Sequence, residues 1–282
     1  MSVLTQLVDN PREFLTGWPT EPTVYERDAD ELAQLFSRND ARRIIADPIL
    51  RSIELGHVRD GALVADAPDA DHPTATLVLN GLHLTWPPLR DASRQLAAEL
   101  GHPVTANVYS TPPHASGYGP HWDTHHVLLA QVEGAKTWRL HPPIVADPLD
   151  IVHRWTKVGF TPEQLKQVRA DADTITLTAG QVLYIPRGWV HFGHTTERHA
   201  LHITFGVQLL TRHWVLRQLL DQATEHPALR AALPPGLSSR PAENVARDSL
   251  TTLADWLDLL DPAVVGRRLQ SDQQLAVLGV TR

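Results

Sequence analysis

The segment His121-Trp122-Asp123 contains residues whose types and spacing could hold a metal ion. Side chains two positions apart on a β-strand leave from the same face, so the imidazole of His121 and the carboxylate of Asp123 can converge on one ion. His191 is the third candidate ligand, because it follows an apolar run and a Pro-Gly turn that a barrel can bring beside the first motif. Two histidines and one carboxylate make the facial triad of non-haem iron oxygenases, which leaves other coordination positions free.

The His-x-Asp pair is a weak signal when it is taken alone. A chain with 16 histidines is expected to contain roughly one such pair by chance, and the alternative is a set of buried polar residues with local hydrogen bonds. The chain has no cysteine, which excludes disulfides, thiolate zinc sites and cysteine nucleophiles. Any metal ion must therefore be held by imidazole and carboxylate, ligands that suit iron, zinc, manganese, nickel or copper.

Lys136 stands out because lysine is rare in this chain. Lys136, Lys157 and Lys166 are its lysines, and the other basic residues are arginines. Lys136 lies inside an apolar strand pattern, where an unpaired ammonium would cost several kcal/mol, so an anionic partner is expected. The alternative is an edge-strand lysine whose ammonium reaches solvent.

The overall charge and hydropathy limit the classes of partner. A formal net charge of −7 argues against non-specific nucleic-acid binding, which needs a basic surface. No apolar stretch approaches the length of a membrane span, and residues 1–14 lack the basic start and apolar run of a signal peptide. We therefore expect a cytoplasmic protein that binds neither nucleic acid nor membrane.

The distribution of apolar residues predicts a mainly β protein with flanking helices. Residues 1–70 alternate helical patches with proline breaks, and residues 104–207 contain short strands separated by glycine and proline, which is typical of a sandwich or barrel. Two of these strands are expected to form a hairpin around Glu133-Gly134. An insertion at 142–173 carries a helix near 162–170. Residues 211–282 have helical periodicity and are a candidate dimerisation element or a folded cap.

Several stretches together resemble one family. Residues 106–113, 119–140, 175–196 and 200–207 resemble the JmjC-type oxygenases of the ribosomal-oxygenase group, which are cupin-like protein hydroxylases. Residues 11–25 and 76–103 resemble the N-terminal part of that group, so the resemblance covers residues 11–220. It implies a double-stranded β-helix (jelly-roll, cupin) catalytic domain over residues 1–210, with its barrel core at 104–207, followed by a helical region at 211–282.

The resemblance also implies roles for individual residues. It implies that iron(II) is held by His121, Asp123 and His191, and that the C5 carboxylate of the cosubstrate 2-oxoglutarate is bound by Lys136. It further implies a cosubstrate pocket lined by Asn107, Tyr109 and Thr204. With dioxygen (O2), such a site would hydroxylate a side chain of a protein or peptide substrate.

Two departures from the family bear on the substrate. The family often has an acidic residue after the aspartate, whereas this chain has Thr124-His125-His126, and residues 211–282 are too few for a helical region plus the winged helix of longer members. A ribosomally made precursor peptide is therefore favoured slightly over a ribosomal protein. The alternatives are a non-oxidative metal-binding cupin with His125 as an extra ligand, and a barrel without catalysis. His194 and His202 are interpreted as structural histidines.

Overall fold

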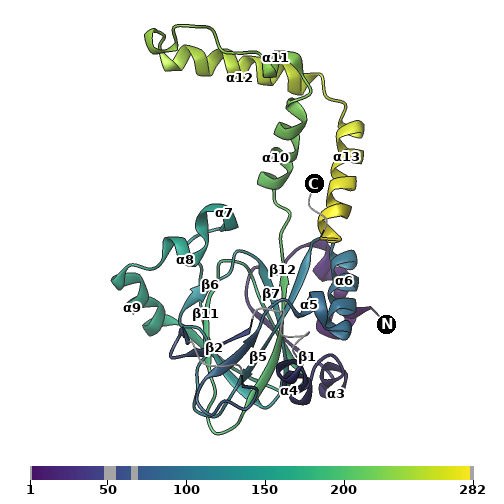
Figure 1. Cartoon of the computed structure of the whole chain (residues 1–282), viewed down its shortest axis with the longest axis vertical. Helices are drawn as coiled ribbons and strands as arrows, with labels where there is room; N and C mark the ends of the chain where they lie inside the picture. The colour runs from purple at the N-terminus through teal and green to yellow at the C-terminus, as the bar shows by residue number, and fades with distance from the viewer. Residues whose placement is uncertain (1, 48–54, 65–68, 280–282) are drawn as a thin grey trace. The chain divides into compact units, whose positions relative to one another are not determined.

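Two antiparallel β-sheets form the larger of the chain's two compact units, residues 1–209 (Figure 1). The computed structural model describes residues 2–47, 55–64 and 69–279. One sheet has the strand order β1-β10-β7-β12-β5-β4-β2-β3, and the other has the order β6-β11-β8-β9. The strands are β1 (Thr23–Glu26), β2 (Leu55–Arg59), β3 (Ala62–Val64), β4 (Thr76–Leu79), β5 (Val104–Thr111), β6 (His121–Trp122), β7 (His126–Glu133), β8 (Ala135–His141), β9 (Asp173–Thr178), β10 (Gln181–Ile185), β11 (Val190–His194) and β12 (Ala200–Val207). The predicted mainly β arrangement with flanking helices is confirmed.

The core lies between the two sheets. The strand β12 is buried along its whole length because it pairs with β7 on one side and β5 on the other. One buried cluster joins side chains of both sheets, since its members come from β7 and β10 in the larger sheet and from β8 and β9 in the smaller one. The cluster consists of Val127, Leu129, Trp138, Leu140, Leu177, Leu183 and Ile185.

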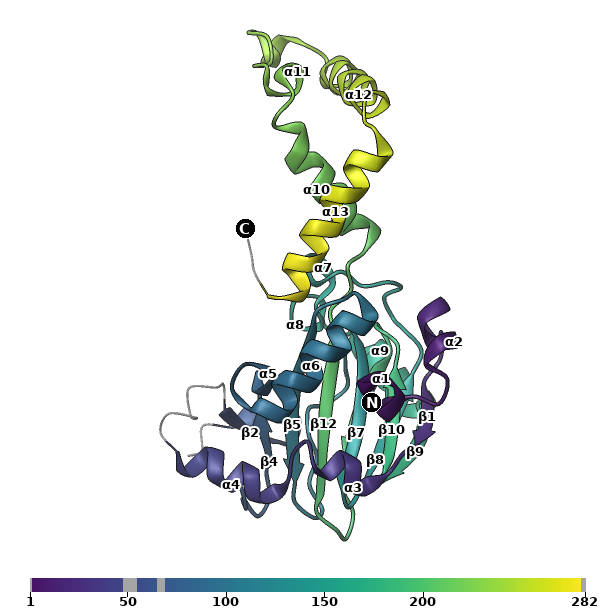
Figure 2. The same cartoon turned by 90° about the vertical axis from the view of Figure 1, so that its right-hand side faces the viewer.

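Helices cover one face of the eight-stranded sheet (Figure 2). The longest of them, α6, begins at Pro87 and ends before Gly101, whose left-handed backbone (φ 70°) closes the last turn. Glu99 of α6 accepts hydrogen bonds from the first turn of α1. The helices before β5 are α1 (Val3–Leu7), α2 (Pro11–Thr16), α3 (Ala29–Ala33), α4 (Arg38–Ala46), α5 (Leu82–Thr85) and α6 (Pro87–Leu100).

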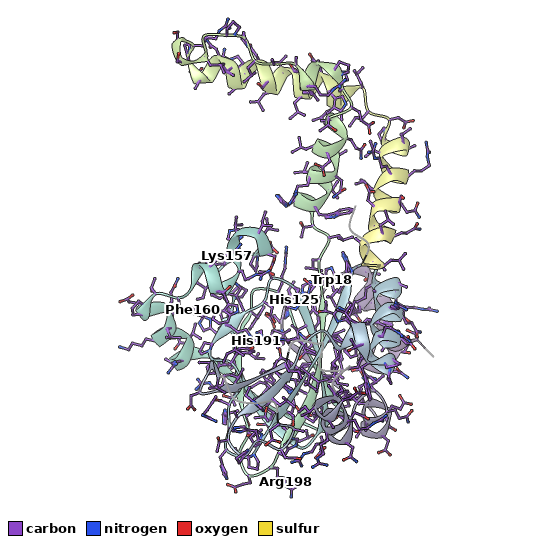
Figure 3. All side chains as sticks on the ribbon, viewed as in Figure 1. Trp18, His125, Lys157, Phe160, His191 and Arg198 are labelled. Atoms are coloured by element: carbon purple, nitrogen blue, oxygen red, sulfur yellow. The ribbon has the colours of Figure 1, made fainter. Side chains whose placement is uncertain are left out.

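The insertion between β8 and β9 is helical and packs on the metal motif's strand. It contains α7 (Asp150–His153), α8 (Trp155–Val158) and α9 (Pro162–Asp171), so the predicted helix near 162–170 is confirmed. Trp122 is buried with Val168 and contacts Phe160, and its indole N–H donates a hydrogen bond of 2.9 Å to the backbone carbonyl of His153. In Figure 3, Phe160 and Lys157 lie on this insertion, at the edge of the unit that holds His191 in its interior.

Two local predictions were wrong. The turn at Glu133-Gly134 does not close a hairpin, because β7 and β8 belong to different sheets and the chain crosses between them there. Residues 1–70 also contain strands as well as helices: β1 pairs with β10, and β2 and β3 form a hairpin around Asp60-Gly61. Both turn residues have positive φ (51° and 85°), as a two-residue Asp-Gly hairpin turn requires. This Asp-Gly pair was overlooked in the sequence because weight was given to the helical periodicity of the region.

Residues 210–282 form the second compact unit, and the described part of it is helical as predicted. Arg268 of α13 forms an ion pair with Glu225, which follows α10. The elements are α10 (Arg212–Ala223), α11 (Pro227–Arg230), the 3-10 helix η2 (Leu237–Ser239), α12 (Ala242–Asp258) and α13 (Pro262–Val277). Among the residues with described structure, no helix is both long and apolar enough to cross a bilayer.

Candidate metal centre

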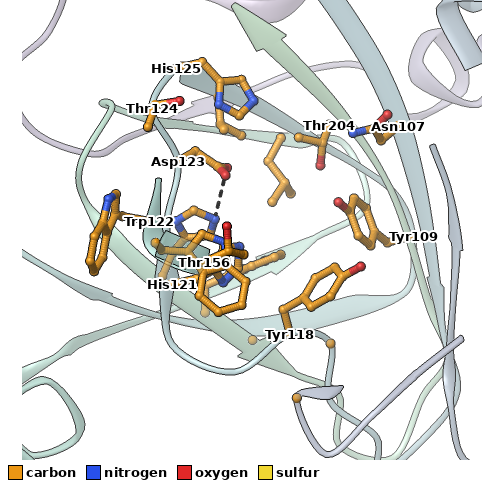
Figure 4. A pocket seen from close by; sticks show the side chains of 18 of the residues that line it. Asn107, Tyr109, Tyr118, His121, Trp122, Asp123, Thr124, His125, Thr156 and Thr204 are labelled. Atoms are coloured by element: carbon orange, nitrogen blue, oxygen red, sulfur yellow. Dashed lines mark ion pairs between the residues drawn. The ribbon is translucent and has the colours of Figure 1, made fainter. Parts of the chain in front are cut away.

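The three predicted metal ligands lie together. His121 on β6 and His191 on β11 are direct partners in an antiparallel strand pair, and Asp123 follows β6 immediately. One possible ligand atom from each residue lies within 4.8 Å of the others, and Nε2 of His191 is 3.6 Å from Oδ2 of Asp123. Figure 4 shows His121 and Asp123 facing the same space, with Trp122 pointing away from it. Alternation along one strand and register between two strands thus produce the cluster.

Hydrogen bonds to the backbone fix both imidazoles in the orientation that a metal needs. Nδ1 of His121 donates to the carbonyl of Gly119 at 2.8 Å, and Nδ1 of His191 donates to the carbonyl of Trp189 at 3.1 Å. With Nδ1 protonated in each ring, Nε2 keeps its lone pair and can coordinate an ion. The chain therefore offers two imidazole nitrogens and one carboxylate oxygen, and this set fits iron(II) and its divalent neighbours.

The charge states of the group support metal binding near neutral pH. Burial, and secondarily the neighbouring His191, lowers the pKa of His121 to about 4, so its imidazole is neutral. Burial opposes ionisation of Asp123, but three nearby histidines outweigh it and lower the pKa of that carboxyl below its usual value. No proton has to leave these two side chains before an ion binds.

A cavity of about 820 Å³ surrounds the cluster. Its walls come from the inner faces of both sheets, and its remaining sides come from the β2–β3 turn and from α7 and α8. The lining includes all seven predicted site residues, which are Asn107, Tyr109, His121, Asp123, Lys136, His191 and Thr204. One space thus holds the metal cluster and the candidate cosubstrate residues.

Lys136 on β8 is a buried cation in this cavity wall. Its side chain is among the largest fully buried ones, the residue is 2% exposed, and its Nζ donates to Oγ1 of Thr111 at 3.0 Å. No carboxylate of the described residues lies within ion-pair distance of it. Burial lowers the pKa of Lys136 to about 7. An anionic ligand would restore the stability of its charged form, whereas the edge-strand alternative does not match this burial.

The pocket residues Asn107, Tyr109 and Thr204 lie on the neighbouring strands β5 and β12 (Figure 4). Thr204 is the direct cross-strand partner of Asn107. Oδ1 of Asn107 also accepts a hydrogen bond from the backbone N–H of Gly81 at 2.9 Å, so this side chain has a structural contact in addition to its place in the lining. Burial raises the pKa of Tyr109, so its phenol stays protonated and can donate a hydrogen bond.

The histidines after Asp123 point to different environments. The ring of His125 lines the cavity and lies against Gly206, where an added Cβ would come within 2.5 Å of it. His125 is not one of the three residues in the metal-ligand cluster. His126 is buried elsewhere: its Nδ1 accepts hydrogen bonds from the hydroxyl of Tyr184 and from the backbone N–H of Arg187, each at 3.0 Å. His126 is therefore a structural histidine.

The structure adds cavity residues that the sequence did not reveal. Tyr118 and Trp155 flank His121, with ring centroids 5.8 and 5.6 Å from its own. Gly193 leaves room for the side chains of Trp138 and Lys136, because a Cβ there would lie 3.0 Å from the Trp138 ring and 3.1 Å from Cε of Lys136. Tyr118 lies three residues before His121, and this short separation could have indicated its place in the cavity. Trp155 had no such indication, because it reaches the site only through the helical insertion.

Comparison with known proteins identifies the domain that carries this centre. The sequence profile of the JmjC domain matches residues 88–215, a range that includes every predicted site residue. Residues 88–215 are a JmjC domain. The resemblance stated from the sequence is thereby confirmed.

Curated proteins share this JmjC domain. Over 140 residues the chain is 39% identical to the bifunctional lysine-specific demethylase and histidyl-hydroxylase NO66 of Drosophila willistoni. The matched region covers 46% of this chain and 17% of that protein. Over 125 residues it is 36% identical to NO66 of Dictyostelium discoideum, covering 43% and 23%. The chain thus spans less than a quarter of the length of these relatives.

Solved structures show the same fold. The Escherichia coli protein YcfD superposes with a TM-score of 0.57 at 18% identity, covering 88% of this chain and 68% of that one. A second structure, described as the ribosomal oxygenase YcfD in complex with cobalt and 2-oxoglutarate, gives a TM-score of 0.56 at 18% identity and covers 88% and 67%. The expected double-stranded β-helix with flanking helices is confirmed.

Proposed function

We propose that this protein is an iron(II)- and 2-oxoglutarate-dependent oxygenase that hydroxylates an amino-acid side chain of a protein or peptide. The observation that carries the proposal is the presence, in one cavity, of the His121–Asp123–His191 cluster and the buried ammonium of Lys136. Three ligands on one side of an ion leave positions for a chelating cosubstrate and for O2. A metal site without an anionic cosubstrate would have no use for a buried cation in its wall.

Different residues of the cavity would bind the metal ion and the cosubstrate. His121, Asp123 and His191 would hold iron(II), and Lys136 would bind the distal carboxylate of 2-oxoglutarate. When bound, the ion and cosubstrate supply the oxidising power: O2 is consumed, 2-oxoglutarate becomes succinate and CO2, and one oxygen atom enters a substrate C–H bond. No general base is required.

The substrate class rests on the aromatic residues beside His121 and on the relatives. Tyr118 and Trp155 offer aromatic surface beside His121, which suits a side chain that reaches in from a peptide. The relatives are described as a histidyl-hydroxylase and a ribosomal oxygenase, which supports a protein substrate. We propose a ribosomal protein or a ribosomally made precursor peptide as the target, in the cytoplasm, and a homodimer contact through residues 211–282.

An anaerobic titration tests the oxygenase proposal. Protein loaded with iron(II) should develop a visible charge-transfer band when 2-oxoglutarate is added, and should release succinate when air is admitted. Lys136→Met should reduce both signals, whereas Lys166→Met, which changes an exposed lysine on α9, should leave them intact. A colourless wild-type mixture that releases no succinate would instead favour the non-oxidative cupin.

A proteomic comparison tests the substrate class. A protein or peptide that gains the mass of one oxygen in wild-type cells should lose that gain in a deletion strain and in a strain carrying His191→Ala. The absence of any such change would contradict a protein or peptide substrate. The succinate assay would still report whether the oxygenase chemistry occurs.

A further inference from the structure

His202 is a fully buried imidazole in the cavity wall beside Lys136. It lies on β12, it is 1% exposed, and its side chain borders the same cavity as the metal cluster. Nδ1 of His202 is buried and has no hydrogen-bond partner among the described residues. A buried polar group without a partner destabilises the fold, so histidine is a poor choice if the ring serves only for packing.

Two aromatic rings hold His202 in a defined orientation. Its ring stacks on Tyr109 with centroids 4.9 Å apart and an interplanar angle of 7°. Its other contact is edge-on to Trp138, at 5.3 Å and 83°. Nζ of Lys136 lies 4.9 Å from the centroid of that same indole. Trp138 therefore places the imidazole and the ammonium in one part of the cavity wall.

The electrostatics at this place favour a neutral imidazole beside a cation. Burial, and secondarily Lys136 and His191, lowers the pKa of His202 well below its usual value. A neutral imidazole keeps one N–H donor and does not repel the ammonium. Lys136 has three N–H donors, of which one goes to Thr111, whereas a carboxylate has about four lone-pair sites. A carboxylate that pairs with Lys136 therefore keeps room for a further donor.

From this geometry we infer that His202 is a cosubstrate-binding residue, which donates a hydrogen bond to the carboxylate that Lys136 binds. The inference rests on the proposed function, since it names a further contact of the same dicarboxylate. It also explains why β12 carries a histidine between Leu201 and Ile203, both fully buried, at a position where an apolar ring would pack equally well. Tyr109 acts on the ligand in part through His202, because the stacked ring sets the direction of the imidazole.

Binding of two 2-oxo acids to the manganese(II)-loaded protein tests the inference without turnover. 2-Oxoglutarate has the distal carboxylate, whereas 2-oxopentanoate has a methyl group there. We expect His202→Leu to weaken 2-oxoglutarate binding on the order of tenfold, the loss typical of a hydrogen bond to a charged group, and to leave 2-oxopentanoate binding unchanged. His202→Gln, which keeps an N–H donor, should recover most of the loss.

Matched controls separate this role from packing. His194→Leu removes an exposed histidine at the end of β11 and should change neither affinity. Equal weakening of both 2-oxo acids by His202→Leu, or no weakening of either, would overturn the inference. If the wild-type protein binds neither acid, the proposed function itself is wrong. That outcome differs from the two outcomes that overturn only the role of His202.

A crystal structure of the wild-type protein with metal and 2-oxoglutarate gives a second test that does not depend on variant folding. A ring nitrogen of His202 should lie within about 3.2 Å of a distal carboxylate oxygen. A separation beyond about 3.5 Å, with the carboxylate held by other groups, would overturn the inference.

Discussion

His121 and His191 are direct cross-strand partners on β6 and β11, and the centroids of their rings lie 4.3 Å apart. This pairing makes the candidate metal centre a property of strand register. A shift of one residue would turn one imidazole to the opposite face of its strand and separate the ligands. The pairing of β11 with β8 fixes the same register from the other side.

The metal cluster predicts different outcomes for two neighbouring histidines. His191→Ala should abolish tight iron(II) or manganese(II) binding, because it leaves two ligands, whereas His125→Ala should change metal affinity by only a few-fold, because His125 lies outside the cluster. Calorimetric titration with manganese(II) measures both. Loss of metal from His125→Ala equal to that from His191→Ala would support a four-ligand, non-oxidative cupin site.

The lowered pKa of Lys136 predicts a pH-dependent affinity for 2-oxoglutarate. The free ammonium loses its proton near pH 7, and a bound carboxylate raises its pKa, so affinity should be full below about pH 7 and should fall roughly tenfold per pH unit above it. Titrations of the manganese(II) form at several pH values provide the measurement. 2-Oxopentanoate is the control, since its affinity should lack this decline.

The same pKa has an opposite consequence for the stability of the ligand-free fold. Between about pH 7 and pH 10 the lysine is protonated in the unfolded chain but not in the folded one. This group therefore makes the free energy of unfolding increase as the pH rises through that range. Lys136→Met should remove both this contribution and the pH dependence of 2-oxoglutarate binding. A variant that keeps the wild-type pH profile would show that another group titrates.

The crossing between the sheets depends on Gly134. Its φ is 71°, and an added Cβ would lie 1.8 Å from the carbonyl oxygen of His199. We expect Gly134→Ala to lower the free energy of unfolding by roughly 3 kcal/mol or more, as measured by urea denaturation, because backbone strain and a collision with main chain add.

Gly159→Ala is the control for that prediction. Gly159 also has positive φ (68°), but nothing lies within 4 Å of its added Cβ. Gly159→Ala should lower the free energy of unfolding only through backbone strain, by about 1–3 kcal/mol. Equal losses for the two variants would mean that the contact at His199 relaxes freely.

The sequence predicted the ligand cluster because its signal is local. Alternation on one strand places His121 with Asp123, and the apolar run and turn before His191 mark the entry to another strand. Sheet membership is not local: Glu133-Gly134 reads as a hairpin turn, but Gly134 serves instead for close approach to His199 as the chain changes sheets. The apolar neighbours of Lys136 in the sequence predicted its burial. The surroundings of His202 could not be predicted in this way, because the rings that contact it, Tyr109 and Trp138, come from other strands.

Trp122 lies between two metal ligands but acts on the insertion. Its indole donates to the carbonyl of His153 at the end of α7, and Trp155, two residues later, contacts His121 at the cavity. Trp122→Phe keeps an aromatic ring and removes the donor, at a cost of about 1 kcal/mol. We expect faster hydrogen exchange over residues 150–158 and a several-fold higher KM for the proposed peptide substrate, with unchanged metal and 2-oxoglutarate affinities.

Trp189→Phe is the matched control, because the Trp189 indole also donates to a backbone carbonyl, that of Thr20 at 3.3 Å, but outside the insertion. It should leave exchange at 150–158 and the peptide KM as they are in the wild-type protein. If Trp122→Phe weakens metal binding as much as it raises KM, the indole supports the metal strand itself. In that case the higher KM would follow from a disturbed metal centre, and the prediction that Trp122 acts through the insertion would be wrong.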